Sequence, residues 1–127
     1  MGFLDNFRKA QNSDLIEGWQ SLETEAQLAA AIKESHQKPV MLFKHSIRCG
    51  ISEGAKQGLI GDWDIDPDKM SFYYLDLINF RSISNKIAAD LNVTHQSPQI
   101  ILVKNGKAIF DTSHHRISVA EIRKALG

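Results

Sequence analysis

Short apolar runs alternate along this chain with segments in which apolar residues recur every three or four positions. The runs have strand length and end at Gly, Pro, Asn or Ser, whereas the periodic segments fit helices that bury one face. The predicted strands are 19–22, 39–43, 72–77, 99–103 and 108–111. The predicted helices are 25–35, 49–60, 82–91 and a final one after Ser118. The resulting order, β-α-β-α-β-α-β-β-α, predicts an α/β protein whose mixed β-sheet is flanked by helices.

Residues at the predicted boundaries support these elements. Thr24 and Ser118 suit the position before a helix, and Glu121 completes a capping box with Ser118. Asn105-Gly106 between the last two strands predicts a tight hairpin.

The second helix contains Gly54 and Gly58, which weaken it by about 1 kcal/mol each relative to alanine. A second interpretation is that their spacing of four residues allows a neighbouring element to approach closely.

Length and composition predict one domain over residues 1–127, with an N-terminal extension at 1–18 and a core at 19–127. The formal net charge is zero, so no basic excess favours nucleic acid as a partner. No segment has the apolar length of a signal peptide or a membrane span, so we expect no membrane partner. The expected setting is the cytoplasm.

Cys49 is the only cysteine, which excludes an internal disulfide and a cysteine-rich zinc site. An unpaired thiol fits a reducing compartment such as the cytosol. The adjacent pair His114-His115 lacks a carboxylate at ligand spacing, and the acidic loop 61–69 lacks the pattern of an EF-hand. We therefore expect no metal site.

The position of Cys49, between a predicted strand and a predicted helix, suits a reactive thiol. Thiols react as thiolates, and a helix N-terminus stabilises an anion through its free N–H groups and its dipole. The N–H groups would come from the first turn, which includes Gly50 and Ile51. Arg48 adds an adjacent positive charge, and Ser52 offers a hydroxyl proton. The alternative is that Cys49 is an ordinary small buried residue.

Ser97-Pro98 stands immediately before the strand 99–103, a position that tolerates proline. Cys49-Gly50-Ile51-Ser52 after one strand and Ser97-Pro98 before a hairpin together resemble the thioredoxin superfamily. That resemblance covers roughly residues 19–127 and implies a thioredoxin-like fold in which a cis Pro98 faces Cys49. Ser52 replaces the usual second cysteine, and Phe43 replaces the usual buried acid, so a dithiol cycle within one chain is impossible.

The segment Phe43-Lys44-His45-Ser46, followed by Arg48-Cys49 and Ile51-Ser52, is similar to the monothiol bacilliredoxins of the YtxJ type. Those proteins typically have proline where this chain has Gly50. The resemblance implies a thiol–disulfide oxidoreductase that removes bacillithiol, or a similar low-molecular-weight thiol, from S-thiolated client proteins. The thiol would be a co-substrate, no cofactor would be tightly bound, and a free thiol or a partner reductase would regenerate Cys49.

Bacillithiol carries carboxylates, so its site should offer cations and backbone donors. The bases that flank the predicted site are Lys44, Arg48, Arg81 and Lys104. Ser97 and Pro98 would present backbone groups, and His45 would orient the loop or transfer a proton. His95 would reach the rim of the site. For His45 and His95 a structural role is the alternative, and for Lys44, Arg81 and Lys104 it is a solvated surface position.

Two other functions remain open. Cys49-Gly50-Ile51-Ser52 differs in one residue from the Cys-Gly-Phe-Ser of monothiol glutaredoxins, which carry a [2Fe–2S] cluster between two subunits. The chain would then be an iron–sulfur carrier. The third possibility is a non-catalytic binding module that kept the fold and lost the chemistry. We rank the bacilliredoxin-like function first because the residues flanking Cys49 fit it better.

Overall fold

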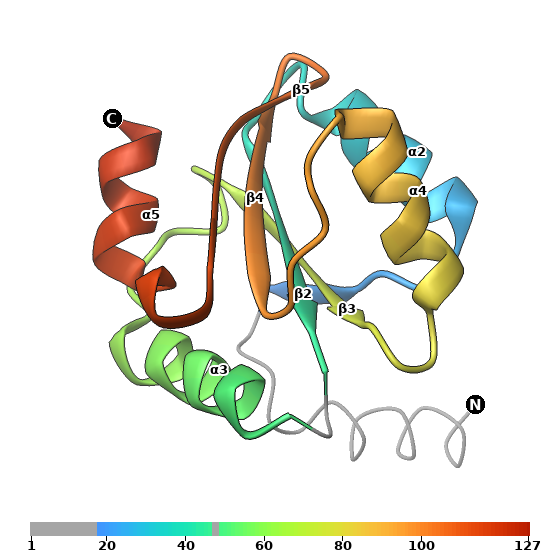
Figure 1. The fold of residues 1–127 in the computed structure, drawn as a ribbon. Helices are drawn as coiled ribbons and strands as arrows, with labels where there is room; N and C mark the ends of the chain where they lie inside the picture. Colours follow the sequence, from blue (N-terminus) through green and yellow to red (C-terminus); the bar gives the residue numbers. More distant parts are fainter. Residues whose placement is uncertain (1–17, 47–48) are drawn as a thin grey trace, which may run out of the picture.

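A computed structural model of the chain describes residues 18–46 and 49–127 (Figure 1). Its elements, in chain order, are β1 (Trp19–Ser21), α2 (Glu25–Glu34), β2 (Val40–His45), α3 (Gly50–Asp62), β3 (Ser71–Asp76), α4 (Arg81–Leu91), β4 (Gln99–Lys104), β5 (Lys107–Ser113), the 3-10 helix η1 (His114–Arg116) and α5 (Val119–Leu126). The predicted order of strands and helices is confirmed, and η1 is an addition to it. The predicted extension at 1–18, except Gly18, lies outside the described residues, and so does Arg48.

The five strands form one mixed sheet in the order β1-β3-β2-β4-β5. β1, β3 and β2 are parallel, whereas β4 runs antiparallel to β2 and β5 antiparallel to β4. Helices α2 and α4 cover one face of the sheet, and α3 and α5 cover the other (Figure 1). This three-layer arrangement makes β2 a central strand with both faces buried.

Burial on both faces explains why β2 is a continuous apolar run and does not alternate with polar residues. Met41 and Phe43 belong to the core under α3 and α5. Val40 and Leu42 belong to the core under α2 and α4. Side chains alternate between the two faces of a strand. Odd-numbered residues of β2 therefore face α3 and α5, and even-numbered residues face α2 and α4.

The predicted caps and hairpin are present. Thr24 Oγ1 accepts a hydrogen bond from Gln27 N (3.0 Å), and Ser118 Oγ accepts one from Glu121 N (3.1 Å). Asn105 and Gly106 have φ values of 54° and 77°, and two positive φ values define a type I′ hairpin turn.

Gly54 and Gly58 do not serve as contact points for another element. A Cβ atom built on either glycine meets no atom of residues 18–46 or 49–127 within 4 Å. The interpretation that their spacing allows a close approach is therefore wrong. Their remaining effect is the conformational entropy that glycine loses in a helix.

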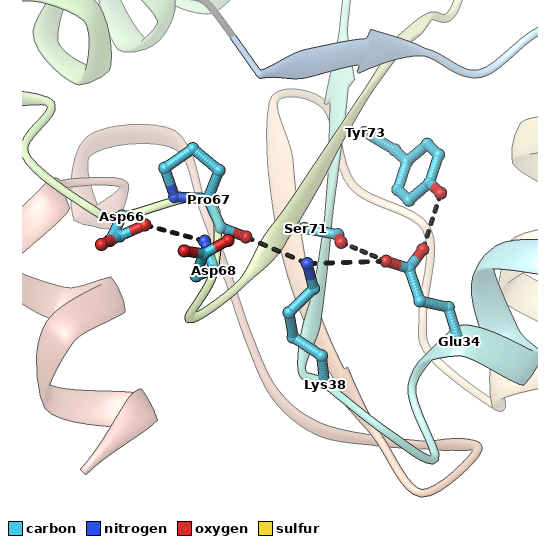
Figure 2. A network of polar contacts seen from close by, with 7 residues as sticks. All are labelled: Glu34, Lys38, Asp66, Pro67, Asp68, Ser71 and Tyr73. Atoms are coloured by element: carbon cyan, nitrogen blue, oxygen red, sulfur yellow. Dashed lines mark hydrogen bonds and ion pairs between the residues drawn. The ribbon is translucent and has the colours of Figure 1, made fainter.

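A polar network at the amino end of β3 holds α2 against the sheet (Figure 2). The Glu34 carboxylate accepts hydrogen bonds from Ser71 Oγ and from Tyr73 Oη, the latter at 2.8 Å. Lys38 Nζ lies 4.0 Å from Glu34 Oε2 and donates to the carbonyl of Pro67 at 3.0 Å. Burial is the main cause that raises the pKa of Tyr73 to about 12, and the bond to Glu34 adds to it.

β2 extends two residues beyond the predicted end at Phe43. Lys44 and His45 pair with Leu75 and Asp76 of β3, and Leu77 N donates to the carbonyl of His45 at 2.8 Å. The backbone ladder therefore continues through two polar residues that an apolar pattern treats as loop. Their side chains, one on each face of the sheet, become part of the interior.

Among the described residues, no helix combines the length and apolar character that crossing a membrane requires. Residues 18–46 and 49–127 also contain no group of three or more His, Cys, Asp or Glu side chains placed to hold a metal ion.

Candidate active site

Cys49 occupies the position immediately before α3. Its backbone is extended (φ −110°, ψ 121°), its side chain is a free thiol, and the residue is partly exposed. Cys49 N donates to the carbonyl of Ser46 (3.1 Å), and the Cys49 carbonyl accepts from Glu53 N (3.0 Å). Cys49 is thus the N-cap residue of α3, and the free peptide N–H groups at a helix N-terminus favour an anion.

The exposed first turn of α3 includes two of the predicted thiolate-stabilising residues. Gly50 is exposed, and a Cβ atom there would meet none of the described residues within 4 Å. Ile51 is 48% exposed, which is unusual for a large apolar side chain in this protein. A reacting disulfide can therefore reach Cys49 across a surface of backbone and apolar atoms.

Ser52 joins the end of β2 to the start of α3. Its Oγ is buried and accepts a hydrogen bond from Ser46 N at 3.0 Å. The hydroxyl therefore holds Ser46, at the end of β2, against α3, and its proton donation to Cys49 stays a prediction. Arg48 lies outside the described residues, so its role remains a prediction.

Pro98 lies at the sheet end where Cys49 also lies. Lys44 of β2 pairs with Gln99 of β4, so the residue before Gln99 is at the carboxyl end of β2. The Ser97–Pro98 peptide bond is cis, and the Pro98 carbonyl accepts from His114 N at 3.1 Å. Ser97 Oγ is buried and has no hydrogen-bond partner among the described residues.

Lys44 points toward the α2 and α4 layer and is 0% exposed. Its Nζ donates to the Ser84 carbonyl of α4 at 3.2 Å and lies 3.2 Å from Nδ1 of His95. Burial lowers the pKa of Lys44 from 10.5 to about 8. A buried ammonium group without an adjacent carboxylate is costly to keep charged.

His45 points toward the other layer and is also 0% exposed. Its Nε2 lies 3.4 Å from Glu53 Oε2, and neither ring nitrogen makes a hydrogen bond of normal geometry with a described residue. Burial is the largest cause that lowers the pKa of His45, and the positive charge of Lys56 adds to it. Glu53 opposes this shift, as do the Ser52 backbone and Asp76. The imidazole is therefore neutral at pH 7.

Two of the predicted substrate-binding side chains, Lys44 and His45, are thus enclosed. Each can influence a bound thiol only through the residues that cover it, because neither reaches the surface. Lys104 lies at the other end of β4, where it pairs with Lys107, so it does not flank this site. His95 and Arg81 are both exposed.

An open polar groove lies between the loop that contains His95 and the end of β5. Thr94 and Gln96 line it from the loop before Pro98, and residues 111–116 line it from β5 and η1. The loop 92–98 therefore presents His95 toward α4, and the residues on either side of it toward β5.

Three residues of this region escaped the sequence prediction. Glu53 contacts His45, and Lys56 contacts Glu53 and acts on His45 through its charge. Ser84 contacts both Lys44 and His95. A signal was available for two of them. Ser84 falls within the buried stripe of α4 formed with Ile83, Ile87 and Leu91, and Lys56 falls within that of α3. Polar residues in an apolar stripe at helical spacing mark buried polar sites.

Comparison with protein families gives a match to the monothiol bacilliredoxin BrxC family over residues 20–122. A solved structure described as an oxidoreductase with a thioredoxin fold is 30% identical, with a TM-score of 0.71 over 87% of this chain and 95% of that chain. The Malassezia sympodialis thioredoxin Mala s 13 is 18% identical, with a TM-score of 0.66 over 84% of this chain and 86% of that chain. Thioredoxin from Trypanosoma brucei brucei is 15% identical, with a TM-score of 0.64 over 84% of this chain and 85% of that chain. The thioredoxin-like fold is therefore confirmed.

Proposed function

Because the chain belongs to the monothiol bacilliredoxin family, we propose that Cys49 removes bacillithiol, or a similar low-molecular-weight thiol, from mixed disulfides on client proteins. One observation carries the proposal: the single thiol is partly exposed at the start of α3, at the sheet end where Pro98 lies. The family and the fold indicate thiol redox chemistry, and the lone cysteine restricts it to a monothiol exchange.

The reaction has two exchanges, each of which conserves electrons. In the first, the Cys49 thiolate attacks the low-molecular-weight thiol's sulfur in the mixed disulfide. A new S–S bond forms to Cys49, the old S–S bond breaks, and the client cysteine leaves as a thiolate that takes a proton from water. In the second, a free low-molecular-weight thiol or a partner reductase attacks the adduct on Cys49. Cys49 leaves as the thiolate, and the attacking thiol is oxidised.

The surroundings of Cys49 fit these exchanges. Cys49 stands at the start of α3, where the helix dipole favours an anion, and the bond between Ser52 and Ser46 holds the end of β2 against this helix. The proposal includes no tightly bound cofactor, S-thiolated proteins as partners, and the reducing cytoplasm as the setting.

The test is mass spectrometry of the reduced protein after reaction with bacillithiol disulfide. We expect one adduct per chain on the wild type and none on Cys49→Ala, and release of bacillithiol from an S-thiolated client peptide only by the wild type. A wild type that takes up no bacillithiol would refute the proposal. Visible absorbance and iron in protein prepared without oxygen would favour the iron–sulfur alternative.

A further inference from the structure

Gln99, the first residue of β4, places a fully buried amide in a row of apolar side chains. It shares its face of the strand with Ile101 and Val103, which belong to the core under α2 and α4. Gln99 itself is 0% exposed. An amide without hydrogen bonds would be costly at such a position, so its partners indicate why it is there.

The Gln99 amide bridges the loop that precedes β4 and the edge strand β5. Its Nε2 donates to the Thr94 carbonyl at 3.0 Å and to Asp111 Oδ2 at 3.4 Å. Its Oε1 accepts from Gln96 N at 3.2 Å. The contact with Asp111 follows from the register, because Gln99 pairs with Ser113 and Asp111 is the diagonal neighbour on the same face. One side chain therefore binds two peptide groups of the loop and one carboxylate of β5.

All three partners require the same orientation of the amide. A peptide carbonyl and a carboxylate can only accept, and a peptide N–H can only donate. A flipped amide would place its oxygen against the Thr94 carbonyl and Asp111, and its nitrogen against Gln96 N. Gln99 therefore holds Thr94 and Gln96 at fixed positions relative to the sheet, and Asp111 opposes the flipped amide.

The loop that this amide holds lies beside the candidate active site. Gln96 directly precedes the cis Ser97–Pro98 peptide bond. The start of β4 is at the end of the sheet nearest the start of α3, where Cys49 is the N-cap residue (Figure 1). Thr94 and Gln96 are exposed and line the groove toward β5 and η1. The loop thus has an exposed outer side and an inner side bonded to a buried amide.

A client protein and a small disulfide make different demands on this loop. When the disulfide of an S-thiolated client reaches Cys49, the client chain on either side of its cysteine lies against the surface around Cys49. A small disulfide needs only the thiol. A loop that is already ordered binds a chain with a smaller loss of entropy than a loop that becomes ordered on binding. The order of the loop should therefore matter for the client and not for the small disulfide.

We infer that Gln99 is a positioning residue for the client: its amide, oriented by Asp111, holds the loop 94–98 in the shape against which the client chain binds during exchange at Cys49. The inference rests on the proposed function and adds to it the residue that prepares the client-binding surface. Because Gln99 is fully buried, it acts through the loop and not by its own contact with the client.

The experiment compares two disulfides that offer Cys49 the same sulfur. One is a client peptide whose cysteine carries mercaptoethanol, and the other is 2-hydroxyethyl disulfide, in which a second mercaptoethanol replaces the peptide. The second-order rate constant is measured for each, and their ratio reports the contribution of the peptide. Gln99→Met keeps the length of the side chain and removes every hydrogen bond of the amide. We expect it to lower the rate constant for the peptide about tenfold and to leave that for the small disulfide within about twofold.

Gln99→Glu tests the orientation of the amide. It replaces Nε2 by an oxygen that faces the Thr94 carbonyl and the Asp111 carboxylate, so the ratio should fall at least as far as in Gln99→Met. Combination with Asp111→Asn removes this repulsion and offers an amide donor to the new carboxylate. The double variant should therefore have a ratio at least about threefold higher than Gln99→Glu alone.

Tyr73→Phe is the control for a general loss of stability. It removes the hydrogen bond from Tyr73 Oη to Glu34 at the amino end of β3, away from Cys49, and its ratio should equal that of the wild type. Hydrogen exchange followed by nuclear magnetic resonance tests the loop directly. Gln96 is exposed, and its amide is bonded to Gln99 Oε1. This amide hydrogen should exchange at least about tenfold faster in Gln99→Met than in the wild type.

The two proposals fail in different ways. A wild type that reacts with neither disulfide refutes the exchange at Cys49. A wild type that reacts with both, with a ratio that is unchanged in Gln99→Met and Gln99→Glu, refutes only the role of Gln99. Equal losses for the two disulfides, no recovery in the double variant, or unchanged exchange of the Gln96 amide would also overturn that role.

Discussion

Replacement of Lys44 by methionine should stabilise the protein, although it removes two hydrogen bonds. The pKa of Lys44 is lowered from 10.5 to about 8, which corresponds to a cost of about 3 kcal/mol for the charged form in the folded state. Methionine has a similar length and is flexible enough to fill irregular space. The two acceptors keep other partners, because His95 is exposed to water and the Ser84 carbonyl lies inside α4. We expect a gain of roughly 1–3 kcal/mol in the free energy of unfolding at pH 7.

The pH dependence of this gain has a defined sign. Between pH 8 and 10.5 the unfolded chain binds more protons at position 44 than the folded chain, so wild-type stability rises with pH. Below about pH 8 both states are protonated and the cost of the buried charge is fully present. The advantage of Lys44→Met should therefore be largest near pH 7 and should shrink as pH rises toward 9.5.

Urea unfolding followed by circular dichroism measures this difference at pH 7, 8.5 and 9.5. Lys104→Met is the matched control, because Lys104 is an exposed lysine on β4. Its effect should stay within about 0.5 kcal/mol and should not depend on pH in this range. If Lys44→Met is less stable than the wild type at pH 7, or if its advantage is equal at all three values, the argument from burial fails.

Three further changes test other parts of the structure. Gly58→Ala should raise the free energy of unfolding by about 0.5–1 kcal/mol, because the added methyl group meets open space and reduces the entropy lost on folding; an unchanged urea midpoint would argue against this. Ser52→Ala should cost about 1–2 kcal/mol and slow adduct formation at Cys49, since Ser46 N loses its partner; a normal rate would show that this bond does not position the thiol. His45 should make the protein less stable below about pH 6.5, because its lowered pKa lets the unfolded chain bind more protons there; urea midpoints of the wild type and His45→Phe at pH 7 and 5.5 measure this, and equal losses in both would contradict it.

The fold was predictable because most of its information is local. The three central strands, β2, β3 and β4, contain runs of apolar residues, and a proline or the Asn105-Gly106 turn marks several strand ends. The order of elements then leaves few topologies, because parallel crossovers and hairpins restrict how a sheet can close. The exceptions were the ends of β5, which continues to Ser113 beyond the predicted 111, and of β2. The last two residues of β2 are polar, and only their pairing with neighbouring strands shows that the strand continues through them.

The site was less predictable, because its contacts join residues that lie far apart in the sequence. Cys49 and Pro98 carry signals of their own, and the sequence order placed both at one end of the sheet. Lys44 and His45 were predicted as substrate-binding residues beside Cys49, but the ladder turns one to each face of the sheet and buries both. Ser84 carried a signal in the buried stripe of α4, but no local pattern reveals that it meets Lys44, and Glu53 carried no signal of its own.

The burial of Lys44 gives a physical reason to expect function beside Cys49. A chain selected only for stability would place an apolar residue at this position, because the neighbouring residues of β2 on the same face, Val40 and Leu42, are apolar. Residues that lower stability persist where they serve activity. Lys44 touches no solvent, so its use must pass through a neighbour, and His95 is the exposed residue that it contacts. The burial of the Lys44 charge lowers stability, and its contact with His95 is the route by which the same charge can act at the surface.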